Sequence, residues 1–112
     1  MTVIETPKFL SAARNLISGE NRALLVDYPA YQPTAGDLIP GTGGVRKLRW
    51  SLEGSGKRGG ARVVYFDNDP HVPIFMLTAY AKNERADLSQ QDRNDFRKLT
   101  ATLVRTVKST KP

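Results

Sequence analysis

The hydrophobic periodicity of the chain changes once, near residue 45, and this change constrains the fold more than any other feature. Before it, apolar residues recur at helical spacing, which predicts one helix over residues 7–17 and a second from about residue 20. After it, apolar and polar residues alternate, which predicts strands over residues 45–51, 61–67 and 73–82. Helices and strands are therefore expected in separate parts of the chain, as in an α+β fold.

Local signals add a strand, an open helix end and a third helix. The β-branched run Thr2–Glu5 predicts a short strand, and Pro7 suits the first turn of the following helix. Pro29 leaves the end of the second helix open, because proline removes a backbone hydrogen bond. Residues 33–44 are rich in proline and glycine and are expected to be irregular. Ser89 is a good N-cap for a C-terminal helix. The apolar stripe of that helix consists of Phe96, Leu99, Leu103 and Val107.

The three strands between residues 45 and 82 are expected to form an antiparallel meander. The last of them is almost continuously apolar, which favours a central strand buried on both faces. A chain of 112 residues has the size of one domain, so we predict a single domain over residues 1–112.

Composition excludes several kinds of site. The chain has no cysteine and one histidine, which excludes disulfides, cysteine-bound metals and paired-histidine sites. Asp67 and Asp69 near His71 are more typical of a turn than of a metal site, and Gly41–Gly44 lacks the lysine of a P-loop. We therefore expect no metal and no cofactor. No segment approaches the roughly 20 apolar residues of a membrane span, and no signal-peptide pattern is present. A cytoplasmic protein with no membrane partner is expected.

The positive charge of the chain is concentrated in one window. Residues 46–62 contain six basic residues and one acidic residue, a net charge of +5 out of the +6 of the whole chain. A field of this kind attracts a polyanion, and nucleic acid is the leading candidate. The alternative is an ordinary solvated surface that keeps the protein soluble.

The cations of this window lie on a loop and on the strands beside it. The loop Gly54–Gly60 carries Lys57 and Arg58, and its backbone can approach a phosphate closely because glycine has no Cβ. Lys47 and Arg49 share one face of their strand, Arg62 lies in the next strand, and Tyr80 and Lys82 share a face of the third. Half-buried cations are costly unless they are paired or functional. Pairing with Glu53 and Glu84 in a structural ion-pair network remains the alternative.

Three segments, in a fixed order along the chain, resemble a known family. They are Asp37–Trp50, Gly56–Tyr65 and Leu77–Glu84, the last followed by Asp87–Leu88. This combination resembles the RelE/HigB superfamily of bacterial toxins, and its HigB-like branch most closely, from about Glu5 to the C-terminal helix. The resemblance implies a RelE-like fold, with two N-terminal helices packed on a small, mostly antiparallel twisted sheet and a C-terminal helix.

The resemblance also implies an activity and partners. It implies a ribosome-dependent mRNA endonuclease of a type II toxin–antitoxin system, acting on mRNA in the ribosomal A site and inhibiting translation. The implied antitoxin is a helix-turn-helix protein encoded by an adjacent gene. In the family pattern, Lys47 stands at the position of a functional lysine, Arg62 is the arginine that opens the next strand, and Lys82–Arg85 is the basic-acidic segment after the last strand.

Two positions depart from the pattern of the best-known members. Asn83 stands where those members carry an arginine, and Ser89 or its neighbours stand where they carry a catalytic tyrosine. Tyr80 is the nearest phenol, with Tyr65 behind it. The Tyr-x-Lys-Asn-Glu form of this segment is common in HigB-like sequences, so the change fits a difference between branches.

These residues can support RNA cleavage without a metal, because RNA supplies its own nucleophile, the 2′-OH. Arg62 is expected to stabilise the transition-state phosphate through a bidentate contact. Lys47 or Lys82, crowded by neighbouring cations, is expected to take the 2′-OH proton. Tyr80 is expected to stack on a base or share the proton transfer. The expected RNA-binding residues are Arg46, Arg49, Lys57, Arg58 and Asn83.

Two other functions fit the same residues. One is a toxin-like module that binds RNA or the ribosome without cutting, which the Asn83 and Ser89 departures favour. The other is a phage-derived structural or interaction protein in which Arg62 and its neighbours form only ion pairs.

Overall fold

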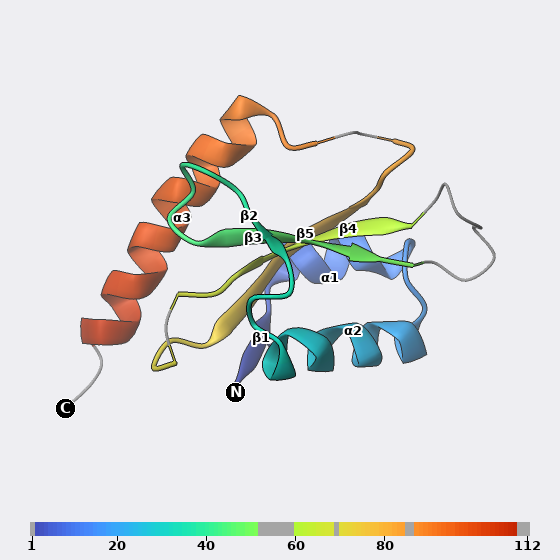
Figure 1. The fold of residues 1–112 in the computed structure, drawn as a ribbon, viewed down its shortest axis with the longest axis horizontal. Coiled ribbons are helices and arrows are strands. Elements are labelled where there is room, and N and C mark those ends of the chain that lie inside the picture. The colour runs from blue at the N-terminus through green and yellow to red at the C-terminus, as the bar shows by residue number, and fades with distance from the viewer. Residues whose placement is uncertain (1, 52–59, 69, 85–86, 110–112) are drawn as a thin grey trace.

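The computed structural model describes residues 2–51, 60–68, 70–84 and 87–109. Along the chain these form, in order, β1 (Val3–Glu5), α1 (Pro7–Arg14), α2 (Gly19–Tyr31), β2 (Asp37–Leu38), β3 (Val45–Trp50), β4 (Ala61–Phe66), β5 (Ile74–Ala81) and α3 (Gln90–Ser109) (Figure 1). The predicted α+β fold is confirmed, with two N-terminal helices, a mostly antiparallel sheet and a C-terminal helix. No helix in the described part of the chain is both long enough and apolar enough to cross a membrane.

The sheet has five strands in the order β1-β5-β4-β3-β2. The predicted meander of β3, β4 and β5 is confirmed, and β1 joins it as a parallel partner of β5. All residues of β4 are buried, and β5 is buried except at Thr78, as expected for central strands.

Helices cover both faces of the sheet and create two separate cores (Figure 1). On one face, α1 and α2 contribute Phe9, Ala13 and Leu25 to a cluster with Val63 and Met76. On the other face, Phe96 of α3 packs with residues of β3, β4 and β5. These residues are Val45, Val64, Phe66, Phe75, Leu77 and Tyr80. Side chains of β4 therefore alternate between the two cores.

Two predicted boundaries were wrong, and the structure fixes the end of the second helix, which the sequence left open. The helix expected over residues 7–17 ends at Arg14, although Ile17 still donates its backbone N–H to the carbonyl of Ala13. Helix α2 continues through Pro29 to Tyr31, because a proline so close to the end disturbs only the last turn. The segment expected to be irregular contains β2, which pairs with two residues of β3.

The predicted N-cap of α3 is confirmed. Ser89 Oγ accepts a hydrogen bond from the backbone N–H of Asp92 at 3.0 Å, and the Asp92 carboxylate accepts one from the backbone N–H of Ser89 at 3.1 Å. This reciprocal pair satisfies backbone donors at the start of the helix. It fixes the start of α3, just after Asp87.

Candidate functional site

Strand register brings four of the predicted site residues to one face of the sheet. Arg49 of β3 lies opposite Arg62 of β4, and Arg62 lies opposite Tyr80 of β5. Residues directly opposite each other share a face, so these three side chains form a row across the sheet. Lys47 precedes Arg49 by two residues and lies on the same face. This is the face that α3 covers, since Val64, opposite Lys47, belongs to the core beneath α3.

Arg62 is the buried member of this row. The whole residue is only 8% exposed to solvent, and its Nη1 lies 3.4 Å from the carbonyl oxygen of Ala61. Among the residues that the structure describes, no carboxylate lies within ion-pair distance of the Arg62 guanidinium. A buried cation is costly unless an anion is close to it, and Glu53, the partner that the sequence left open, lies outside the described residues.

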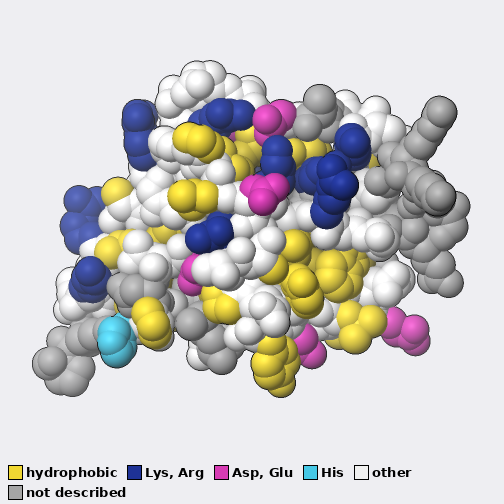
Figure 2. Space-filling view, viewed as in Figure 1, with side chains coloured by type: hydrophobic (Ala, Val, Ile, Leu, Met, Phe, Trp, Pro, Cys, Tyr) yellow, Lys and Arg dark blue, Asp and Glu magenta, His cyan; other side chains and the backbone are white. Residues whose placement is uncertain are grey.

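A cavity of about 390 Å³ opens beside Arg62. Its lining residues are Ala35, Asp37, Lys47, Leu48, Arg49 and Arg62. Three of them are cations and one is an acid, so the cavity attracts anions. Arg49 is exposed, and its side chain makes no hydrogen bond or ion pair with another described residue. In the view of Figure 2, Lys and Arg side chains gather over the upper part of the molecule, with Asp or Glu side chains among them.

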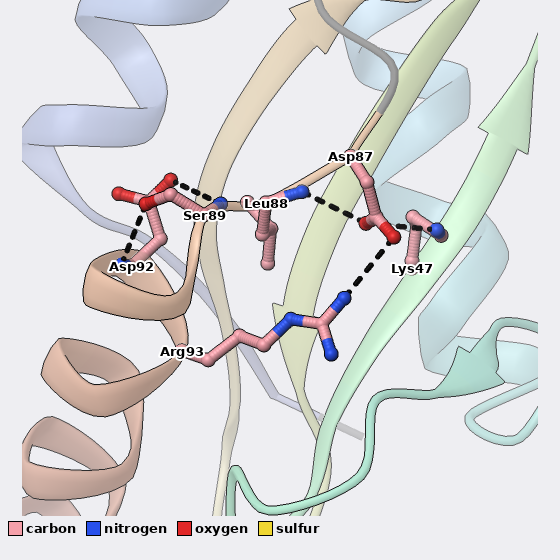
Figure 3. A network of polar contacts seen from close by, with 6 residues as sticks. All are labelled: Lys47, Asp87, Leu88, Ser89, Asp92 and Arg93. Carbon is pink, nitrogen blue, oxygen red and sulfur yellow. Dashed lines mark hydrogen bonds and ion pairs between the residues drawn. The ribbon is translucent and has the colours of Figure 1, made fainter.

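Lys47 is anchored by Asp87, a residue from the segment just before α3 (Figure 3). Lys47 Nζ lies 3.1 Å from Asp87 Oδ1, and Arg93 Nη2 lies 3.1 Å from Asp87 Oδ2. The backbone N–H of Leu88 donates to Asp87 Oδ1 at 2.8 Å. This backbone hydrogen bond, together with the charges of Lys47 and Arg93, lowers the pKa of Asp87 below its usual value.

The alternative of an ion-pair network with Glu53 and Glu84 is not supported at Glu84. Glu84 is exposed and makes no ion pair with any described residue, whereas Asp87 pairs with Lys47. Glu53 lies outside the described residues. The sequence predicts that cations crowd Lys47, but the structure places the Asp87 carboxylate against its ammonium group.

The Asp87 network predicts a small, acid-sensitive contribution to stability. Because the pKa of Asp87 is lower in the folded state than the roughly 3.9 of an unfolded chain, its contribution is present above that value and is lost as the pH falls through the folded value. The side chain is 43% exposed, so we expect Asp87→Asn to cost less than about 1 kcal/mol at pH 7.

Urea unfolding at pH 7 and at pH 2.5 would test this expectation, with Asp27→Asn on the exposed side of α2 as the control. The difference between wild type and Asp87→Asn should be smaller at pH 2.5 than at pH 7, while the control should match wild type at both. Equal differences at the two pH values would contradict the assigned ion pairs.

Tyr80 is buried rather than available for stacking. The residue is 7% exposed, and its ring belongs to the core beneath α3. The expected stacking of Tyr80 on a base therefore does not fit the structure, because both faces of a stacking ring cannot be covered by core residues. In the strand register, Tyr80 lies opposite Arg62.

The other predicted residues are not part of this row. Arg46 lies on the opposite face of β3, where its Nη1 donates to the carbonyl oxygen of Gly36 at 2.8 Å and its Nε lies 3.9 Å from Asp67 Oδ2. Lys82 and Asn83 are exposed in the turn after β5, next to the end of β4 that carries Arg62. The predicted RNA-binding residues Lys57 and Arg58 lie outside the described residues.

Tyr65 holds the segment that forms one rim of the cavity. Its buried hydroxyl donates to the carbonyl oxygen of Pro33 at 2.7 Å and accepts from the backbone N–H of Gly36 at 2.9 Å. Burial raises the pKa of Tyr65, so the phenol stays protonated and able to donate. A Cβ on Gly36 would lie 3.0 Å from both the Lys47 carbonyl oxygen and the Tyr65 ring, which explains the glycine.

A comparison with family models agrees with this architecture. The model for the RelE toxin of the RelE/RelB toxin–antitoxin system matches residues 34–110. The match covers more than half of the chain and includes β2 to α3, and thus every strand that lines the cationic cavity. The chain therefore belongs to the RelE toxin family, whose members are the toxins of toxin–antitoxin pairs.

Proposed function

We propose that this RelE-family toxin is a metal-independent endoribonuclease that cleaves mRNA on the ribosome, and that it belongs to the HigB-like branch. Residues 1–112 would form a single toxin domain acting in the cytoplasm, where translated mRNA is found. The observation that carries the proposal is the buried Arg62 guanidinium, which lies in a row with Arg49 and beside Lys47 at a cationic cavity. An RNA phosphate is the ligand that best matches three convergent cations.

In the proposed reaction, the 2′-oxygen of one ribose attacks the adjacent phosphorus as its proton leaves. The bond from phosphorus to the 5′-oxygen then breaks, giving a 2′,3′-cyclic phosphate and a 5′-hydroxyl end. Arg62 would stabilise the negative charge that develops on the phosphoryl oxygens, because its low exposure strengthens electrostatic contacts. Lys47, fixed by Asp87, would hold the phosphate in position.

Proton transfer would fall to Lys82 or to Tyr80. Lys82 is an exposed amine one residue beyond β5, and its backbone N–H donates to the Gly60 carbonyl beside the start of β4. Tyr80 is buried opposite Arg62. With so few groups for proton transfer, the free protein should be slow, and the ribosome would supply the in-line geometry of the mRNA.

A binding-only toxin is the second candidate, and one observation favours it. Ser89, which stands near the place of the family's catalytic tyrosine, has its hydroxyl engaged in capping α3. The Ser89 side chain therefore caps the helix, and Ser89 does not take the place of the missing tyrosine as general acid. In this reading, the cations bind RNA or ribosome and block translation without cleavage.

Controlled expression followed by mapping of mRNA 5′ ends tests the proposal. Growth arrest with new 5′ ends inside translated messages, and cleavage of purified mRNA only when ribosomes are added, is the expected result. Arrest without new 5′ ends would support the binding-only toxin. Cleavage of free mRNA at the same rate with and without ribosomes would contradict ribosome dependence.

A further inference from the structure

A second cavity adjoins the cationic one at the open edge of β3. It measures about 400 Å³ and is lined by Asn21, Tyr28, Leu48, Arg49, Trp50 and Ser51. Leu48 and Arg49 line both cavities. Strand β2 pairs only with Arg46 and Lys47, so in the described part of the sheet residues 48–50 have no neighbouring strand on this side. The two cavities therefore meet along this edge, with Arg49 between them.

The second cavity has aromatic walls. Tyr28 of α2 and Trp50 of β3 have ring centroids 6.1 Å apart with planes inclined by 57°. Tyr28 is 42% exposed, so part of its ring surface faces solvent. Asn21 adds an amide that can both donate and accept hydrogen bonds. Figure 2 shows a hydrophobic patch directly below the gathered Lys and Arg side chains of this face.

These groups match the chemistry of a nucleobase. Unpaired RNA bases are recognised by stacking on aromatic rings and arginine planes, and by hydrogen bonds to their polar edges. The cavity offers aromatic rings from Tyr28 and Trp50, the guanidinium plane of Arg49 and the polar amide of Asn21. Because a base and its phosphate are joined through one sugar, and because Arg49 lines both cavities, an RNA strand bound at Arg49 has access to both.

We propose that the Tyr28–Trp50 cavity is a base-binding subsite, which holds a nucleobase of the RNA strand whose phosphate binds at Arg49 and Arg62. The inference rests on the proposed function, since it requires RNA in the cationic cavity. It adds a contact between RNA and Tyr28 of α2, whereas the cations of the row lie on β3 and β4. The subsite would make single-stranded RNA, rather than any polyanion, the preferred ligand.

The sole tryptophan of the chain makes this subsite directly observable. Trp50 is the only tryptophan, so intrinsic tryptophan fluorescence reports on this cavity alone. Two probes separate the base from the charge: a 2′-O-methyl hexaribonucleotide, which cannot be cleaved because its 2′-oxygens are blocked, and an inorganic polyphosphate of similar charge. We expect the hexaribonucleotide to quench Trp50 and the polyphosphate to bind without quenching.

Variants on α2 supply a matched comparison. Tyr28→Ala should weaken binding of the hexaribonucleotide about tenfold, the loss typical of one base–aromatic stack, and should leave polyphosphate binding unchanged. Tyr31→Ala removes a tyrosine that is 84% exposed on the same helix but does not line the cavity, and both affinities should stay at wild-type values. Tyr28→Phe keeps the ring and should restore hexaribonucleotide binding, which separates stacking from misfolding.

The outcomes distinguish this inference from the function on which it rests. If the hexaribonucleotide binds in a salt-dependent way without quenching Trp50, and Tyr28→Ala binds it as wild type does, the base subsite is wrong and the cationic site stands. If neither probe binds, the cationic cavity is not an anion site in the free protein and the base subsite fails with it, whereas the proposed cleavage is decided by mapping mRNA 5′ ends with ribosomes present. If Tyr28→Ala impairs binding of the antitoxin but not of RNA, the aromatic surface is a protein-docking surface and the base subsite is wrong.

Discussion

Replacing Arg62 by alanine should nearly abolish toxicity while the protein stays folded. A preorganised donor at a developing negative charge contributes about 2–4 kcal/mol to transition-state stabilisation, so cleavage should fall by roughly 30- to 1,000-fold. The fold should survive because, among the described residues, the Arg62 side chain makes no ion pair, so alanine breaks none of the ion pairs that the structure shows. Growth after induction, 5′-end mapping and a thermal unfolding curve measure the three parts of this expectation.

Two further variants sharpen the test of Arg62. Arg14→Ala removes an arginine from the exposed end of α1, on the face of the sheet away from the cavity, and should leave toxicity and the thermal transition unchanged. Arg62→Lys keeps the charge but loses the bidentate geometry, so its activity should lie between alanine and wild type. An Arg62→Ala protein with the wild-type thermal transition and wild-type toxicity would show that the site is assigned to the wrong residue.

The main architecture could be predicted because it depends on periodicity. The change from helical to alternating spacing near residue 45 separates α1 and α2 from β3, β4 and β5. Strand β2 was not predicted because two residues are too few to show an alternation. Its pairing with β3 depends on a tertiary contact, the hydrogen bond from the backbone N–H of Gly36 to the Tyr65 hydroxyl, which holds the chain just before β2. The end of α2 could not be predicted, because a proline in a helical pattern does not indicate how many residues stay helical after it.

The cationic row was predictable and its counter-charge was not. Alternation along each strand, with the register of an antiparallel meander, is enough to place Lys47, Arg49 and Arg62 on one face. Asp87 reaches Lys47 across 40 residues of sequence, after the chain has left the sheet and before it starts α3. No local pattern encodes such a contact, although Asp87 stands in a segment that carries the family resemblance.

Co-expression of the neighbouring reading frame should restore growth to cells that produce this protein. Membership of the RelE family implies an antitoxin partner, and we expect a small helix-turn-helix protein encoded beside this chain. Residues 46–62 carry six basic residues and one acidic residue, so an acidic amphipathic segment that orders on contact would complement this surface. On size exclusion, the co-expressed toxin should elute as a larger species than the toxin alone.

The mode of neutralisation follows from the same complex. An antitoxin that covers the cavity of Lys47, Arg49 and Arg62 would block binding of the 2′-O-methyl hexaribonucleotide, and raising the salt concentration should weaken the complex. An antitoxin that only makes the toxin too bulky for the ribosomal A site would leave hexaribonucleotide binding intact. Either result fits a toxin–antitoxin pair, because both keep the toxin from translated mRNA. A neighbour that neither restores growth nor changes the elution of the toxin would show that the adjacent frame does not encode its antitoxin, and the binding-only toxin would then become the better account of this chain.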